Sequence, residues 1–274
     1  MKYITLKSSD FGRSGHSLKD FFTCHVFSFL IKDLTVIPTQ QWNSKQHILK
    51  FPINKDLKDY KFSQSINIEK KIWNGMSFES FCSIRDKILA LPDNSLITLI
   101  NHTRIHPHQL TEWFKSNLIK EDVFITKFIP TLRNLYFKDN KSEELNCLSI
   151  HVRRGDIANP SKNCYIEQAN MRWPVEYFEE NIISFQKTNP NLPINIFTEK
   201  ECSDDLEILK QYDNVEIHRG DTESLKHDIQ NMVNSKYFMP CNSSLSTWIS
   251  YISKGSIIMP QNKYIKHFHS EHIW

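Results

Sequence analysis

The sequence lacks several features that would indicate particular classes of protein. Only 6 of its 274 residues are glycine, and no Asp-x-Asp motif of the kind that binds divalent cations is present. The net charge at pH 7 is only +3, so the overall charge points neither to nucleic acid nor to a membrane surface. Any anion-binding site must therefore be a local arrangement.

The 6 cysteines include no Cys-x-x-Cys pair, which fits free thiols better than a disulfide framework. The most apolar stretch, residues 21–31, is too short to span a bilayer. Residues 1–7 alternate and are followed by polar residues, unlike a secretory signal. We expect a cytoplasmic protein without a transmembrane segment. A trimmed Golgi-type luminal domain is the alternative, and peripheral membrane association is left open.

The carboxyl-terminal half alternates short β-branched runs with helical patterns, which predicts a parallel sheet covered on both faces. Pro174 suits a first helical turn and Thr222 an N-cap. The expected strands are 147–152, 194–197, 215–218, 237–241 and 256–259. The expected helices are 174–186, 203–212, 222–235 and 244–253.

The amino-terminal half is less regular, and the polar stretch 39–75 indicates long loops or an insertion facing an acceptor. A polar break at 138–144 separates the halves, which predicts two α/β domains, 1–140 and 141–274. The expected strands are 3–6, 34–37 and 96–100, and the expected helices 18–30, 79–91 and 122–137.

Polar residues follow four of the predicted strands in the second half. They are His151–Asp156, Thr198-Glu199, His218–Asp221 and Asn242–Ser244. Ligands of parallel α/β sheets bind beyond the carboxyl ends of the strands, so these groups are expected at one ligand-binding edge.

Two adjacent arginines, Arg153 and Arg154, supply rigid donor forks that match phosphate oxygens, and Gly155 permits a tight turn beside them. A surface salt-bridge pair is the alternative. Ser243 and Ser244 begin a predicted helix, where free backbone N–H groups form either an anion site or an ordinary N-cap.

Two short motifs are distinctive, namely His151-Val-Arg-Arg-Gly-Asp156 and Gly12-Arg-Ser-Gly-His-Ser17. They resemble the His-x-Arg-Arg and Gly-Arg-x-Gly-Asn-Gln motifs of the GDP-fucose-dependent fucosyltransferase superfamily, which includes α1,2-, α1,6- and protein O-fucosyltransferases. The α1,2 branch is most similar. It shares the pattern of Asp228-Ile-Gln-Asn-Met232, the turn Asn242-Ser-Ser-Leu-Ser-Thr-Trp248 and the strand Ile196-Phe-Thr-Glu199.

The resemblance implies a GT-B fold, with two Rossmann-like domains facing across a cleft. Residues 1–140 would form the acceptor side and 141–274 the nucleotide-sugar side, an arrangement that allows the last residues to pack back on the first domain. It also implies metal-independent, inverting transfer from GDP-fucose to a glycan hydroxyl, with no cofactor. The expected donor contacts are His151, Arg153, Arg154, Asp228, Asn242, Ser243, Ser244, Thr198 and Gly15.

Arg154 is the expected catalytic residue nearest the leaving oxygen, whereas the base is open. Asp156 is either a base or a partner that orients the arginines, and Glu167 is another candidate. His16 departs from the family's Asn, so it is either an acceptor contact or base, or a tolerated substitution. Gly12 and Gly15 allow close approach of the backbone to a ligand, although a plain turn explains them equally.

Other interpretations stay open from the sequence alone. Histidines at 102, 106 and 108 and at 267, 269 and 272 could bind zinc, but no cysteine supports this, and no metal site is expected. The alternative functions are transfer of another GDP-sugar and a catalytically silent nucleotide- or glycan-binding module. The expected partners are a nucleotide-sugar donor and a glycan acceptor, not nucleic acid. The sequence does not indicate an oligomeric state.

Overall fold

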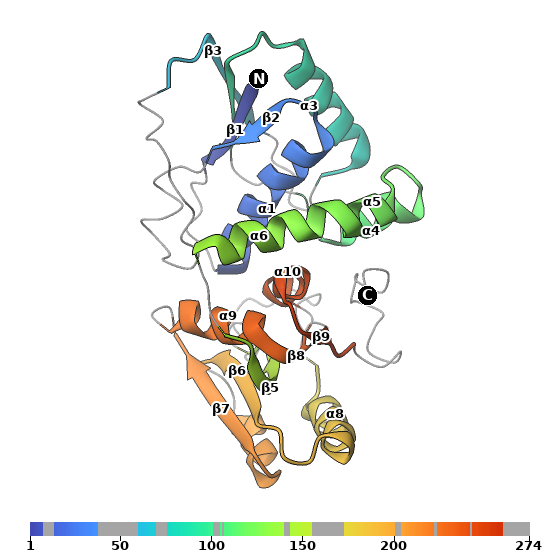
Figure 1. Ribbon diagram of the computed structural model, residues 1–274, viewed down its shortest axis with the longest axis vertical. Helices are drawn as coiled ribbons and strands as arrows, with labels where there is room; N and C mark the ends of the chain where they lie inside the picture. Colours follow the sequence, from blue (N-terminus) through green and yellow to red (C-terminus); the bar gives the residue numbers. More distant parts are fainter. Residues whose placement is uncertain are drawn as a thin grey trace, which may run out of the picture. The chain divides into compact units, whose positions relative to one another are not determined.

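A computed structural model describes residues 1–7, 14–37, 60–69, 76–100, 105, 107–139, 143–154, 173–200, 204–221, 224–241 and 243–259 (Figure 1). The chain divides into two compact units between Asn140 and Lys141, each with its own parallel sheet. The α/β class and the Rossmann-like units predicted from the sequence are therefore confirmed. Among the helices described, none is long and apolar enough to cross a membrane.

The first unit contains a four-stranded parallel sheet in the order β2-β1-β4-β3. Its central strands are rich in fully buried aliphatic side chains such as Ile4, Ile97 and Leu99. The strands are β1 (Lys2–Lys7), β2 (Leu34–Val36), β3 (Gln64–Glu69) and β4 (Ser95–Ile100). The helices between and after them are α1 (Ser14–Leu30), α3 (Phe78–Ala90) and α4 (Pro107–Lys115).

The sequence analysis missed β3 and α4. β3 is an edge strand whose only buried hydrophobic side chain is Ile68, so its composition is that of a polar loop. In α4, the buried residues Leu110, Trp113 and Phe114 do have helical spacing, but the pattern is short and follows a histidine-rich, polar segment.

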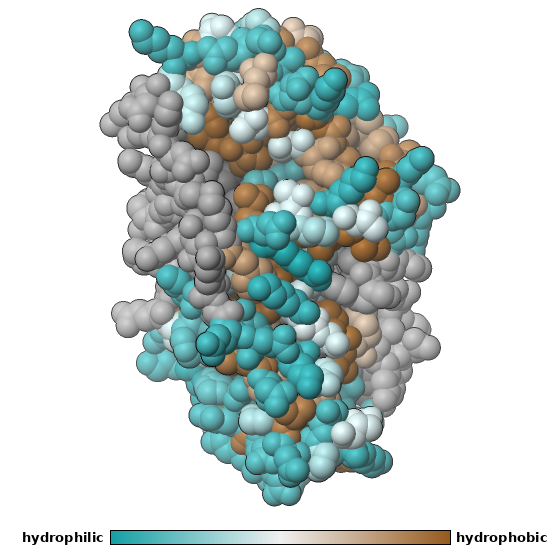
Figure 2. All heavy atoms as spheres, viewed as in Figure 1, coloured by the Kyte–Doolittle hydropathy of each residue, from teal (hydrophilic) through white to brown (hydrophobic). Residues whose placement is uncertain are grey.

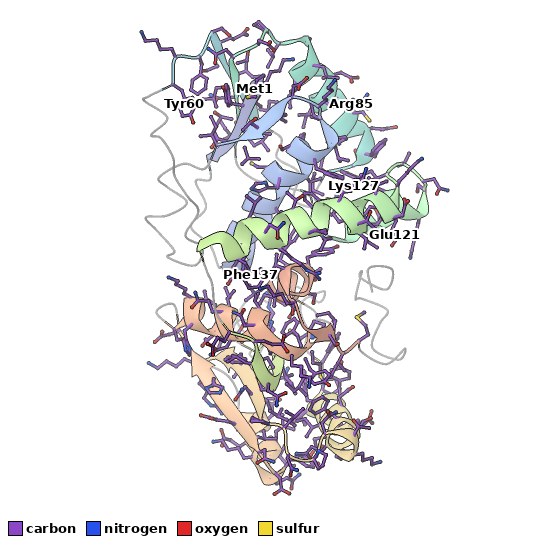
Figure 3. All side chains as sticks on the ribbon, in the orientation of Figure 1. Met1, Tyr60, Arg85, Glu121, Lys127 and Phe137 are labelled. Carbon is purple, nitrogen blue, oxygen red and sulfur yellow. The ribbon has the colours of Figure 1, made fainter. Side chains whose placement is uncertain are left out.

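The helix expected over 122–137 is one rod made of three segments, α5 (Glu121–Val123), a π-helical turn η2 (Phe124–Phe128) and α6 (Ile129–Asp139). Figure 3 marks Glu121, Lys127 and Phe137 along this rod.

Some large hydrophobic side chains, such as Leu118 and Ile208, remain exposed and are scattered along the chain. On the face that Figure 2 shows, hydrophobic residues are interspersed with hydrophilic ones.

The second unit contains five parallel strands in the order β7-β6-β5-β8-β9. They are β5 (Leu145–His151), β6 (Ile194–Glu199), β7 (Val215–Gly220), β8 (Ser235–Met239) and β9 (Ser256–Ile257). The connecting helices are α8 (Val175–Thr188), the 3₁₀ helix η4 (Asp204–Gln211), α9 (Leu225–Asn234) and α10 (Ser244–Ile252). From β5 to β7 the chain adds strands in one direction along the sheet, and it then turns back to β8 on the other side of β5. Because parallel crossovers are right-handed, this change of direction places α8 and α9 on opposite faces of the sheet.

Three details of the second unit differ from the sequence analysis. The segment expected as an α-helix over 203–212 is 3₁₀, which stacks the fully buried Leu206 and Leu209 at a spacing of three. The N-cap of α9 is Ser224, not Thr222, because reciprocal bonds between Asp221 and Ser224 close a turn first. β8 ends before Cys241, whose N–H donates to Ser246.

Candidate functional site

The carboxyl ends of β5 and β8 form the topological switch point of the second unit. The two strands are neighbours, yet the chain leaves β5 towards β6 and returns from β7 to β8. The crevice beyond such a point is where open α/β sheets bind ligands. His151 ends β5, and Ser243 precedes the helix that follows β8, so the predicted residues lie at the expected edge.

His151 is buried between the two strand ends. Its Nδ1 lies 2.5 Å from Ser246 Oγ and 3.5 Å from Cys241 Sγ, and the ring is 7% exposed. Burial alone would lower the pKa of His151, but the charge and hydrogen bond of Cys241, together with the charge of Glu199, raise it. Burial would likewise raise the pKa of Cys241, but the charge of His151 and the bonds from His151 and Ser246 lower it.

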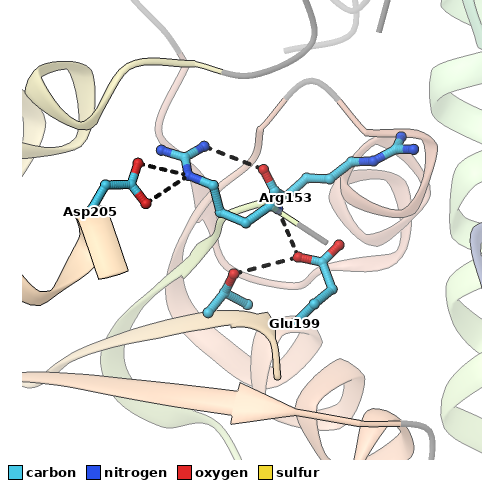
Figure 4. Close-up of polar contacts among 5 residues, drawn as sticks. Arg153, Glu199 and Asp205 are labelled. Atoms are coloured by element: carbon cyan, nitrogen blue, oxygen red, sulfur yellow. Dashed lines mark hydrogen bonds and ion pairs between the residues drawn. The ribbon is translucent and has the colours of Figure 1, made fainter. Parts of the chain in front are cut away.

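Arg154 faces the interior of the second unit. Its side chain is 1% exposed, its Nε lies 3.2 Å from Asp205 Oδ2, and its guanidinium lies 5.7 Å from the centre of the Phe178 ring. The backbone N–H of Arg154 donates to Glu199 Oε2 at 2.8 Å (Figure 4). Arg154 therefore fastens the segment after β5 to the end of β6 and to the beginning of η4.

Arg153 has different surroundings from its neighbour. Its side chain is partly exposed and extends away from Asp205 and Glu199 in Figure 4. Thr198, 6% exposed, donates to Glu199 Oε2 at 3.4 Å and so supports the carboxylate that holds the backbone after Arg153. Arg153, unlike Arg154, therefore has a partly exposed side chain just beyond the carboxyl end of β5.

Asp228, in the first turn of α9, is a buried carboxylate close to the same edge. It is 9% exposed, and Ser224 Oγ donates to its Oδ2 at 3.0 Å. Burial raises its pKa, although Ser224 and the positive charges of His227, His218 and His151 act in the opposite direction. Gly220 makes room for this carboxylate, since a Cβ there would lie 2.2 Å from Oδ2.

Ser243 is the N-cap of α10, and its Oγ accepts the Leu245 N–H at 3.2 Å. The first turn of this helix therefore brings backbone N–H groups to the carboxyl end of β8. Such N–H groups, like the guanidinium of Arg153, are suited to binding an anion.

Some predicted residues lie outside the part that the structure describes. These are Asp156, Glu167, Asn242 and the histidines at 102, 106, 267, 269 and 272. Gly15 and His16 lie in the first turn of α1, and Ser244 begins α10, each described by its backbone. Within the described residues, no group of three potential metal ligands occurs.

The sequence analysis did not identify Cys241, Asp205 or Ser224 as parts of this region, and it assigned no role of their own to Gly220 and Ser246, which lie within segments that it placed there. Ser246 lies four residues after Asn242 in a turn whose motif was recognised, so its helical position was an available signal. The pairing of Arg154 with Asp205 joins residues 51 positions apart and has no local signature.

The sequence matches the family described as Glycosyl transferase family 11 over residues 10–274. No curated protein gives a significant match. Similar solved structures include POFUT1 in complex with GDP-fucose, at 11% identity over 94% of this chain and 97% of that chain, with a TM-score of 0.46. Another is the E. coli heptosyltransferase WaaC with ADP, at 11% identity over 94% of this chain and 87% of that one, with a TM-score of 0.40.

Proposed function

The chain belongs to glycosyl transferase family 11, and we propose that it transfers fucose from GDP-fucose to a hydroxyl group of a glycan acceptor. Membership of the family makes it a glycosyltransferase. The observation that supports GDP-fucose as the donor is that a partly exposed arginine, Arg153, and a buried carboxylate, Asp228, both lie at the carboxyl-terminal edge of the second sheet. The arginine suits a diphosphate and the carboxylate suits a base that offers N–H donors.

In this proposal the diphosphate is held by Arg153 and by the amino-terminal turn of α10, with Ser243, Ser244 and Asn242 beside it. Cationic groups on the departing oxygens stabilise charge that grows as the glycosidic bond breaks, so no metal ion or cofactor is required. Arg154, which the sequence analysis expected nearest the leaving oxygen, is here assigned a supporting role instead, because its buried guanidinium forms an ion pair with Asp205.

Guanine recognition falls to Asp228 and His151. Guanine offers N–H donors at N1 and N2 and acceptors at O6 and N7. A carboxylate accepts from the first pair, and uracil has no matching pair of donors. The preference for GDP over UDP follows from this match.

The acceptor hydroxyl attacks the sugar from the face opposite the leaving diphosphate, which inverts the anomeric centre. His16 and Asp156 are the proposed recipients of the hydroxyl proton, and Gly15, next to His16, stays a proposed donor contact. Thr198 supports the site through Glu199.

A transferase that uses another GDP-sugar is the second candidate function, since the proposed contact residues would bind the nucleotide and would not distinguish one sugar from another. Turnover of GDP-fucose, GDP-mannose and UDP-sugars with an array of glycan acceptors tests the proposal. Transfer from GDP-fucose in clear preference to the others supports it. Preference for another donor, or no turnover with any, contradicts it.

A further inference from the structure

Ser246 fastens the His151 ring to the first turn of α10, although Ser246 is not among the proposed donor contacts. Ser246 is fully buried, and its Oγ lies 2.5 Å from His151 Nδ1. The same Oγ accepts the backbone N–H of Cys241 at 3.1 Å. One hydroxyl thus joins the ends of β5 and β8 at the switch point.

The proton on the Ser246 hydroxyl has two possible acceptors. His151 Nδ1 is 2.5 Å away, whereas Cys241 Sγ is 3.4 Å away. A hydroxyl that donates to Nδ1 makes this nitrogen the acceptor, so the proton of a neutral ring lies on Nε2. When the ring is charged, both nitrogens carry protons, and Nε2 is again a donor.

We propose that Ser246 is a positioning residue that fixes the orientation of His151 and keeps a proton on Nε2, so that the ring offers a hydrogen-bond donor to the nucleotide. This inference rests on the proposed function. It adds a specific requirement, because guanine and phosphate both present acceptors that only a protonated nitrogen can bind.

The neighbouring groups fit this assignment. Asp228 lies close enough for its pKa to respond to the charge of His151, so a fixed acceptor and a fixed donor share the edge. Together they complement guanine, whose edge carries both N–H donors and O6 and N7 acceptors. A ring free to exchange tautomers would offer the donor for only part of the time.

Ser250 provides a matched control on the same helix. It is also fully buried, but its Oγ donates to the backbone carbonyl of Ser246, one turn earlier in α10. Ser250→Ala therefore removes a buried serine hydroxyl without touching His151. A purely structural role of Ser246 predicts similar behaviour of the two alanine variants.

The first test is a long-range ¹H–¹⁵N spectrum of the histidine rings in the free protein, with His151 assigned by its loss in His151→Gln. We expect the wild type and Ser250→Ala to show a protonated Nε2, and Ser246→Ala to show averaged shifts from exchanging tautomers. A wild-type ring protonated on Nδ1 alone would overturn the inference, even if Ser246→Ala failed to fold. So would an unchanged His151 spectrum in a folded Ser246→Ala protein.

The second test is GDP-fucose binding by calorimetry. Loss of one net hydrogen bond to a ligand-facing group corresponds to about three- to tenfold weaker binding in Ser246→Ala. Ser250→Ala should bind as the wild type does, and equal losses in the two variants would contradict a positioning role. Absence of GDP-fucose binding by the wild type would sink the proposed function instead, while the ring spectrum alone would still decide how Ser246 acts on His151.

Discussion

Arg154 Nε and Asp205 Oδ2 lie 3.2 Å apart, in an ion pair whose arginine is 1% exposed and whose aspartate is 26% exposed. The pair joins the segment after β5 to the beginning of η4. The two adjacent arginines therefore differ in their surroundings, since Arg154 is buried in the interior of the unit and Arg153 is partly exposed.

Removal of Asp205 should destabilise the protein. Asp205→Ala leaves the buried guanidinium of Arg154 without its carboxylate, which we expect to lower the free energy of unfolding by about 2–3 kcal/mol, allowing for the partial exposure of Asp205. Chemical denaturation measures this. Glu207→Ala is the control, because Glu207 belongs to the same 3₁₀ helix and pairs with Lys210 and Arg219 at the surface. Equal stability of the two variants would contradict the assigned role of Arg154.

Gly220→Ala should weaken donor binding more than it affects stability. A Cβ at this position would lie 2.2 Å from Asp228 Oδ2 and 2.6 Å from Ser224 Oγ, so the carboxylate must move. Loss of a charged hydrogen bond to guanine should weaken GDP-fucose binding about tenfold or more relative to the wild type.

Gly255→Ala gives the contrasting result. Its Cβ would meet the backbone carbonyl of Ser235 at 2.1 Å, so this variant should lose stability. Calorimetry and thermal melting separate the two effects. Unchanged binding by Gly220→Ala would remove Asp228 from the donor site.

The raised pKa of Asp228 predicts a pH dependence of donor binding. Burial favours the neutral acid, so on acidification the carboxylate protonates above the usual range for aspartate and stops accepting from guanine. Affinity for GDP-fucose should therefore fall as the pH drops through that raised pKa. Ser224→Ala removes a bond that lowers the pKa, and should move the loss of affinity to higher pH. A profile unchanged in Ser224→Ala would argue against this origin.

Chelators should leave the activity intact. The proposed mechanism neutralises the departing diphosphate with an arginine and helix N–H groups, so it needs no metal ion. Turnover of GDP-fucose is measured with and without EDTA. Loss of activity that added Mn²⁺ or Mg²⁺ restores would refute the metal-free mechanism.

The sequence predicts the second unit better than the first, for physical reasons. The strands β5 and β6 bury most of their residues and contain several large apolar side chains, whereas the polar edge strand β3 buries little and was missed. Motif residues at strand ends were found because topology places strand ends together. The partners that hold them, Asp205 and Ser246, act across the fold and leave no local pattern.

Binding of GDP-fucose to the wild type and to Arg153→Ala, measured by calorimetry in the presence of EDTA, tests the account most directly. The side chain of Arg153 is partly exposed just beyond the carboxyl end of β5, so Arg153→Ala should bind GDP-fucose at least about tenfold more weakly while it still unfolds cooperatively. Arg85→Ala, which removes an exposed arginine paired with Asp86 on α3, should bind as the wild type does. Equal affinity of Arg153→Ala and the wild type would contradict the central claim that this strand edge holds the donor diphosphate.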